Sequence, residues 1–398
     1  MQSAPLKRNL GLTLLTLYGV GVMVGAGIYV LVGSVAAQAG IWAPLAFLVA
    51  GLIAAPSALS YAELSSRIPE ASGEAAYVEK GLNSHFLAVL IGLAIVLAGT
   101  VSAAAVLKGG VGYLTAIIDV RAEWAIIGVG AALTLVAIIG VLESLSLAAV
   151  FTVTEVLGLA IVIYAGFTAA PVPEAATLTM PHWPGVAGAA VLAFFAFIGF
   201  EDLVNMAEEA RDPTRVVPRA ILIALAITTL LYILVSLAAV RAVPVEALAN
   251  SERPLVLVWE AKFTASPVIL GAIAVAAALN GVLAQIVMAA RVLYGLGRRE
   301  KRLRVFYRAH PKFGTPALAT FLLGAAVILA ALLLPVSDLA TLTAIVLLMV
   351  FAVVNLALIA LKRREPNAPF RTATWIPWAG LIASVLALTS SFITGALW

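Results

Sequence analysis

The sequence predicts an all-α integral membrane protein with about eleven transmembrane helices. Composition is the first reason: of 398 residues, 63% are hydrophobic and only 11% are charged, whereas soluble domains carry about 25% charged residues. The second reason is spacing. The apolar residues gather in runs of about 20, the length that crosses a bilayer, and short polar segments separate the runs. No soluble core could bury so much apolar surface.

The predicted spans form two sets of five and one additional helix, all within a single transmembrane domain covering 1–398. We treat 10–169 as a first repeat, 185–361 as a second repeat and 375–397 as an extra helix. The individual spans are 10–36, 42–65, 85–118, 124–141, 144–169, 185–208, 217–240, 266–296, 316–334, 339–361 and 375–397.

Charge sets the expected orientation. Most of the 24 lysines and arginines fall on one side of the predicted membrane, and cytoplasmic loops are the ones enriched in these residues. We therefore expect a multi-pass protein of the cell (inner or plasma) membrane with a cytoplasmic N-terminus. The basic run 298–304 lies on that same side, so topology explains it better than nucleic-acid binding. The chain has no cysteine, which excludes disulfides, and we expect neither a cofactor nor a metal site.

Two spans carry residues that disfavour a continuous helix. The first has glycines at 19, 21, 25 and 27, and glycine is a poor helix former; close helix packing is the alternative explanation. The sixth has Gly199 among aromatic residues, followed directly by Glu201 and Asp202. Each such carboxylate costs about 2.5–3.5 kcal/mol to insert at membrane depth. Both patterns indicate a discontinuous helix.

The two interruptions lie five helices apart, so the halves insert with opposite polarity, as in transporters built from inverted repeats. Amides freed at the first break would hold a carboxylate, and carbonyls freed at the second would hold an ammonium. Such a pair of sites matches a zwitterionic amino acid. The candidate substrate-binding residues are Val24, Gly25, Ala26, Gly27 and Ile28, then Phe195, Ala196, Phe197, Ile198, Gly199 and Glu201, and Asn280.

Four segments carry a family resemblance: the glycine-rich run 25–29, the segment 61–74, the segment 194–218, and the run 291–298 with 310–316. In this order they resemble the amino acid-polyamine-organocation (APC) transporters. The resemblance implies the leucine-transporter fold, with a five-plus-five inverted repeat, and alternating-access transport of an amino acid across the bilayer. Members commonly have twelve helices, whereas about eleven are expected here.

Coupling is the second departure from the family pattern. Many sodium-independent relatives place a lysine in helix five, where this sequence has Glu155. A carboxylate near the midplane favours its protonated form, so Glu155 is our candidate for proton coupling; a permanently protonated structural residue is the alternative. Lys108 is a second coupling candidate, with snorkelling toward the outer surface as its alternative. Glu201 and Asn280 have structural alternatives too, as a half-helix cap and a packing hydrogen bonder.

Other functions remain as alternatives. Exchange or facilitated diffusion would use the same fold, and a polyamine or other amine carrier would need no carboxylate site. A channel is less favoured, because channels have little use for two half-helices in inverted repeats. An intramembrane enzyme is disfavoured, since no HExxH or phosphate-binding glycine motif occurs. The sequence leaves the oligomeric state and the accepted side chain open.

Overall fold

The computed structural model describes residues 10–69, 73–115, 117–139, 145–176, 180–264 and 268–393. These residues are helical apart from short connections and one isolated bridge between Leu10 and Ala210. The fold class predicted from composition is therefore confirmed at the level of an all-helical protein. The predicted span ends at 141, 144, 266 and 397 lie outside the described residues.

Each predicted span coincides with a helix or a broken helix. The first five are α1 (Leu12–Ala39), α2 (Ala43–Arg67), α4 (His85–Leu114), α5 (Ala122–Ile139) and α6 (Leu145–Thr168). The sixth is α8 (Trp183–Phe194) followed by the 3₁₀ segments η2 (Phe195–Phe197) and η3 (Glu201–Glu209). The rest are α9 (Pro213–Ala242), α12 (Val268–Arg299), α13 (Ala317–Leu333), α14 (Val336–Arg364) and α15 (Trp375–Ile393).

Fewer helical segments of the structure meet the length and hydropathy needed to cross a membrane than the eleven spans that the sequence predicts. In the described part of the chain, 8 helical segments are long and apolar enough to span a bilayer, and one of them, 27–67, joins the second half of α1 to α2. Three shorter apolar helices, Leu12–Gly25, Ala317–Leu333 and Trp375–Thr389, accompany them. These findings make the chain a multi-pass membrane protein, with about eleven spans remaining a prediction.

Helix ends differ from the predicted ones for local reasons. Helix α9 begins at Pro213 rather than at residue 217, because proline is well tolerated in a first helical turn. Helix α12 continues to Arg299, since basic side chains are favourable at a helix C-terminus. The short helix α3 (Gly73–Leu82) was missed, because a search for spans of about 20 residues passes over a helix of ten. The other short elements are η1 (Gly40–Trp42), α7 (Pro173–Ala176), α10 (Val245–Ala249), α11 (Pro254–Glu260) and η4 (Lys301–Phe306).

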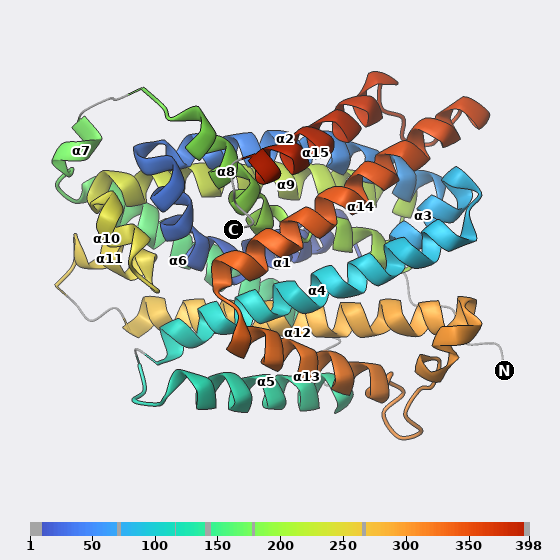
Figure 1. The fold of residues 1–398 in the computed structure, drawn as a ribbon, viewed down its shortest axis with the longest axis horizontal. Helices are drawn as coiled ribbons and strands as arrows, with labels where there is room; N and C mark the ends of the chain where they lie inside the picture. The colour runs from blue at the N-terminus through green and yellow to red at the C-terminus, as the bar shows by residue number, and fades with distance from the viewer. Residues whose placement is uncertain are drawn as a thin grey trace.

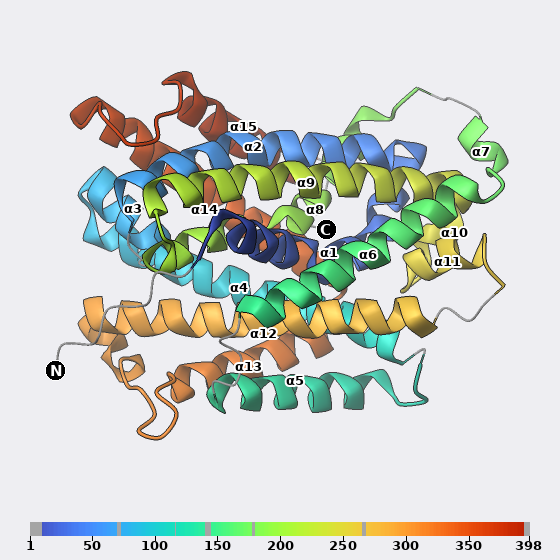
Figure 2. The same ribbon diagram turned by 180° about the vertical axis from the view of Figure 1, so that it is seen from behind.

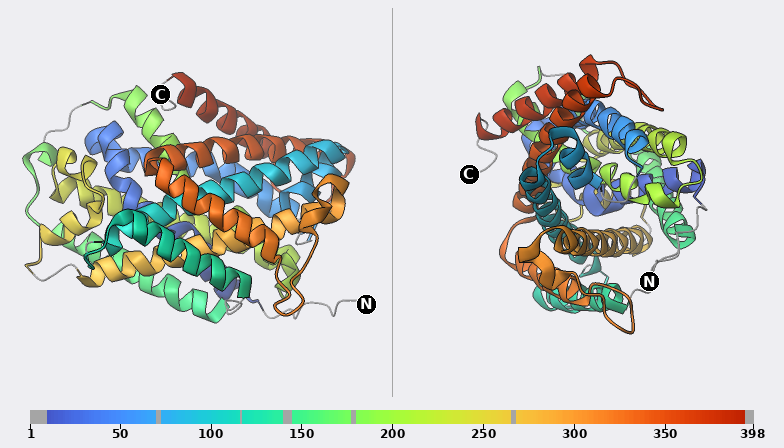
Figure 3. Two further views of the ribbon diagram at one scale, coloured as in Figure 1. Left: turned by 60° about the horizontal axis from the view of Figure 1, so that its bottom comes forward. Right: turned by 90° about the vertical axis from the view of Figure 1, so that its right-hand side faces the viewer.

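Helices that are five apart in the order of spans pack against one another. Helix α2 lies along α9 and α4 lies along α12 (Figures 1 and 2), α5 pairs with α13, and α1 contacts α8. Figures 1 and 2 and the right view of Figure 3 place α5 and α13 at one edge of the bundle and α15 at the opposite edge. The described N-terminal residues, α3 and the α14–α15 linker share one end of the bundle, and α7, α10 and α11 share the other (Figure 1).

Small residues allow this close packing, as expected where lipid tails supply no hydrophobic drive between helices. Gly166 of α6 is buried against α9: a Cβ added there would lie 2.5 Å from the Ala238 carbonyl oxygen. A Cβ added at the exposed Gly128 of α5 would meet nothing within 4 Å. Both glycines lie inside helices, so alanine gains the same helix propensity at each. The two substitutions therefore differ mainly in packing.

Gly166→Ala should destabilise the protein, because the added methyl group pushes α6 from the backbone of α9 at a cost of about 1–3 kcal/mol. The measurement is the apparent melting temperature in detergent, which should fall. Gly128→Ala is the control and should keep or raise it. Equal melting temperatures for the two variants would contradict the packing at α6 and α9.

Candidate functional site

The first span is interrupted at Gly25, where φ is −3° and ψ is −161° inside α1. Val24 and Ile28, on either side, are fully buried, while the side chain of Ala26 lies outside the described part of the structure. A Cβ added to Gly25 would meet nothing within 4 Å, so open space adjoins the break. A helix interrupted here ends one set of backbone carbonyls and begins a new set of free amides.

The second break follows Phe197. Ile198 is extended, Gly199 has φ +126°, and the chain resumes as the 3₁₀ segment η3. Only glycine adopts such a φ without strain, and a side chain there would also strike Val22 of α1. The Gly199 amide donates to the Glu201 carboxylate at 3.0 Å. Glu201 therefore stabilises the break from within.

The two breaks touch each other. A Cβ added to Gly27 would lie 3.3 Å from the Ala196 Cα, so the predicted substrate-binding segments of α1 and η2 come together. Tyr232 of α9 joins them: its hydroxyl lies 2.6 Å from the Met23 carbonyl oxygen and 2.7 Å from the Ala196 carbonyl oxygen. One proton is thus shared between two acceptors. Sequence reasoning missed Tyr232, although a tyrosine in the middle of a span signals a hydroxyl that needs a buried partner.

The aromatic side chains around the second break pack within the bundle. Phe197 meets the Tyr232 ring at 5.1 Å between centroids, and Phe200 packs against Phe351 at 5.1 Å. Phe195, Ala196 and Ile198 are buried as well.

Glu155 of α6 is buried beside the first break. The Tyr29 hydroxyl donates to the Glu155 backbone carbonyl at 2.9 Å, and the hydroxyls of Tyr29 and Tyr232 interact electrostatically with its carboxyl group. Asn280 of α12 approaches the carboxyl, yet neither carboxyl oxygen has a hydrogen-bond partner of normal geometry in the described residues. Two predicted site residues, Glu155 and Asn280, are therefore neighbours.

Lys108 has a structural partner. Its ammonium donates to the Leu334 carbonyl at 2.7 Å, and Leu334 is the residue that caps the C-terminus of α13. A lysine at this position satisfies a carbonyl that the helix leaves free. This contact agrees with the snorkelling alternative, and a coupling role for Lys108 stays a prediction.

A second group of buried acidic residues lies between the breaks and the end of the bundle that is predicted to face the cytoplasm. Glu74 of α3 interacts with Asp202 and with the Tyr61 side chain, and Gln285 of α12 donates to Asp202 at 3.3 Å. Helix α3 lies outside the candidate spans; burial, assisted by the negative charge of Asp202, raises the pKa of Glu74 to about 7. Sequence reasoning missed Glu74 and Gln285, because only the fold brings α3 and α12 to η3.

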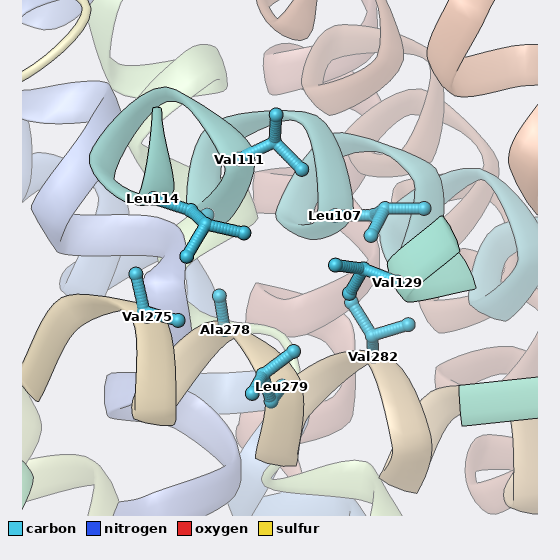
Figure 4. Close-up of a pocket in the computed structure, with 9 residues that line it drawn as sticks. Leu107, Val111, Leu114, Val129, Val275, Ala278, Leu279 and Val282 are labelled. Atoms are coloured by element: carbon cyan, nitrogen blue, oxygen red, sulfur yellow. The ribbon is translucent and has the colours of Figure 1, made fainter. Parts of the chain in front are cut away.

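One small cavity lies between α4, α5 and α12 (Figure 4). Its volume is about 10 Å³, enough for about one water molecule, and none of its lining residues belongs to either break. An apolar space of this size does not suit a zwitterion. No group of three or more potential metal ligands occurs in the residues that the structure describes. The lining residues are Leu107, Gly110, Val111, Leu114, Val129, Val275, Ala278, Leu279 and Val282.

Tyr232→Phe should destabilise the protein, because the buried carbonyls of Met23 and Ala196 lose their shared donor at a cost of about 1–3 kcal/mol. The measurement is the apparent melting temperature in detergent. Tyr164→Phe is the control, since Tyr164 is an exposed tyrosine of α6 and its ring contact survives the change. If Tyr232→Phe melts like the control, the shared hydroxyl is not what joins the breaks.

Comparison with known proteins identifies the family to which this chain belongs. Residues 10–398 match the profile of the family described as amino acid permease. The chain is 29% identical over 392 residues to the branched-chain amino acid permease BcaP of Bacillus subtilis (strain 168), covering 92% of this chain and 83% of the relative. It is 30% identical over 423 residues to the methylthioribose transporter of the same organism, covering 100% and 91%, and 29% identical over 397 residues to cationic amino acid transporter 4 of Mus musculus, covering 92% and 61%. The chain therefore belongs to the amino acid permease family, within the APC superfamily.

Proposed function

We propose that this protein is a secondary active transporter that carries an amino acid across the cell membrane by alternating access, coupled to a proton. The observation that carries the proposal is the contact between the two broken segments, joined by Tyr232. Broken helices at membrane depth are tolerated where they line a binding cavity. Membership of the amino acid permease family makes a solute carrier the fitting role, rather than an enzyme.

The first break supplies the carboxylate site. Amides of Gly25, Ala26 and Gly27 begin the second half of α1, where the helix dipole favours an anion. The space beside Gly25, with nothing within 4 Å of an added Cβ, leaves room for the carboxylate. Close approach of a ligand to this backbone is what an absent side chain permits.

The second break supplies the ammonium site, in a narrower form than the sequence suggested. The Ala196 carbonyl already accepts from Tyr232, and the Phe195 carbonyl accepts from the Ile198 amide at 3.2 Å. The carbonyls of Phe197 and Ile198 are the acceptors that we assign to the substrate ammonium. An ammonium bound at this break lies beside the other break, where the amides of Gly25 and Gly27 would hold the carboxylate. An α-amino acid requires these two sites to be close together.

The packing of helices five apart supports an inverted repeat, because elements near a pseudo-two-fold axis contact their own counterparts. Such pairs are α1 with α8, α2 with α9, α4 with α12, and α5 with α13. Under this proposal 10–169 and 185–361 are the two repeats and α15 is additional. The basic end of the bundle, with α3, η4 and the α14–α15 linker, faces the cytoplasm by the positive-inside rule, as does the N-terminus.

Glu155 is the proposed proton carrier. It is a buried carboxyl in a predicted span beside α1, and Asn280 is one of its side-chain neighbours. Intramembrane carboxylates of this kind characteristically mark proton relays. A carboxyl without a strong partner exchanges a proton without first breaking an ion pair.

Other carriers of the same fold remain to be separated by experiment. The 30% identity to a methylthioribose transporter makes that thiosugar a second candidate, and it has neither carboxylate nor ammonium. An exchanger would ignore a proton gradient, an amine carrier would accept solutes without a carboxylate, and a channel would show no saturable counterflow. A panel of labelled amino acids, a polyamine and methylthioribose therefore tests all of these together.

Glu155→Gln should abolish accumulation driven by an inward proton gradient, because the amide cannot load a proton. The measurement is uptake of the labelled panel into proteoliposomes with and without the gradient. Solute counterflow without a gradient should survive in the variant, which separates lost coupling from lost folding. Glu123→Gln, an exposed carboxylate at the start of α5, is the control. Unchanged gradient-driven uptake by the Glu155 variant would remove the coupling role.

Gly25→Ala should raise the apparent KM for the amino acid about tenfold or more, corresponding to about 1.4 kcal/mol. The added methyl group enters the space proposed for the substrate carboxylate and has no atom from the rest of the protein, outside its own stretch of α1, within 4 Å. Initial uptake rates give the KM, and the melting temperature checks folding. Gly128→Ala serves as the control. An unaltered KM in a folded Gly25 variant would rule out carboxylate binding at this break.

A further inference from the structure

A basic cavity lies where α14 passes into α15, at the end of the bundle that also holds α3 (Figure 1). Its volume is about 80 Å³, and one water needs about 10–15 Å³ of such space. The cavity therefore has room for several waters or for a phosphate group. Its lining includes Lys362, Arg363, Pro366, Arg371, Thr374 and Trp378.

The walls of this cavity are fixed by the buried carboxylate of Glu63. Its oxygens receive Lys362 at 2.6 Å and Arg67 at 2.7 Å, and the Thr372 amide donates to it at 2.8 Å. Arg67 also donates to the Glu365 carbonyl at 2.7 Å. The linker between α14 and α15 is thereby bonded to the end of α2, so the cavity is formed before any ligand arrives.

The cavity has excess positive charge. Lys362 and Arg67 both pair with the buried Glu63, whose single negative charge offsets only one of them, and Arg363 and Arg371 are exposed at the rim. In the described ranges, neither guanidinium lies within ion-pair distance of a carboxylate. Two planar guanidiniums beside a phosphate-sized space suit bidentate binding of a phosphate.

An apolar stripe on α15 leads away from this cavity. Trp378, Ile382, Val385 and Leu386 are between 42% and 62% exposed, and their spacing places them on one helix face. Tryptophan at the mouth marks the membrane–water interface, where its ring is enriched. A ligand that fills the cavity and follows the stripe has an anionic head and an apolar tail.

We propose that the junction of α14 and α15 binds an anionic phospholipid, with the headgroup phosphate held by Arg363 and Arg371 and an acyl chain lying along Trp378, Ile382 and Leu386. Charge complementarity selects the anionic lipid over a neutral one, and basic pockets between transmembrane helices bind such headgroups. The site lies outside the two helix breaks and is independent of the transport proposal.

The test is native mass spectrometry of the full chain in detergent, titrated with phosphatidylglycerol or with phosphatidylcholine of the same acyl chains. The natural protein should retain one phosphatidylglycerol in preference to phosphatidylcholine. The double variant Arg363→Gln/Arg371→Gln should lose that preference at least about fivefold. The control Arg304→Gln/Arg308→Gln removes the same charge from exposed positions at the same end of the bundle and should keep it.

Two further arms identify the ligand. Ile382→Ser/Leu386→Ser changes only the exposed stripe and should weaken phosphatidylglycerol retention, as a lipid but not a free anion requires. Glycerol phosphate added in excess should fail to displace the lipid. Equal preference in the Arg363/Arg371 variant and its control would overturn the proposal. Displacement by glycerol phosphate, together with an unaffected stripe variant, would also overturn it by making the cavity a soluble-anion site.

Discussion

The shared hydroxyl of Tyr232 is the contact on which the central part of this structure depends. A helix broken at membrane depth leaves backbone carbonyls without partners, and hydrocarbon cannot satisfy them. Tyr232 supplies a donor to Met23 in one broken segment and to Ala196 in the other. A break also leaves backbone amides without partners, and the Glu201 carboxylate accepts one of them, that of Gly199. Each interruption is thus stabilised from inside the bundle, which leaves only selected backbone groups for a ligand.

The second constraint is the buried carboxylate of Glu63. Removing one partner from a buried ion pair is costly, at about 3–5 kcal/mol, because the other charge stays desolvated. Here the charge is shared among Arg67, Lys362 and Thr372, which come from two distant parts of the chain. The α14–α15 linker therefore cannot leave α2 without removing Lys362 and Thr372 from the Glu63 carboxylate. This fixes α15 to the helices of the proposed repeats.

The sequence predicts the two helix breaks, but it does not predict the hydrogen bonds that stabilise them. The reason is physical. Glycine at 25 and 199 and acids at 201 and 202 violate helix and membrane preferences locally, so the sequence itself carries the signal. Tyr232 violates nothing local; its acceptors lie 209 and 36 positions away, and a backbone carbonyl has no residue signature. Helix α3 was missed because its burial comes from contacts with α4 and α14, not from length. Asn280 was chosen only as a polar residue at depth, and the fold supplied its neighbour Glu155.

At Glu155 the backbone carbonyl holds α6 against α1, whereas the carboxyl group is the part that would change its charge. Tyr29 of α1 donates to the backbone carbonyl of Glu155, and Tyr113 of α4 donates to the carbonyl of Tyr29 at 2.6 Å, so α6 stays joined to α1 whatever the charge on the carboxyl group. Asn280 of α12 faces the carboxyl itself. Under the proposed coupling, a change in protonation acts on the contact with Asn280 and on the nearby hydroxyls of Tyr29 and Tyr232. Helix α12 packs along α4 and also contacts the broken helix α1 and α6, so under the proposed proton coupling the charge on Glu155 would be sensed where α12 meets α1 and α6, at a boundary between helices of the two proposed repeats.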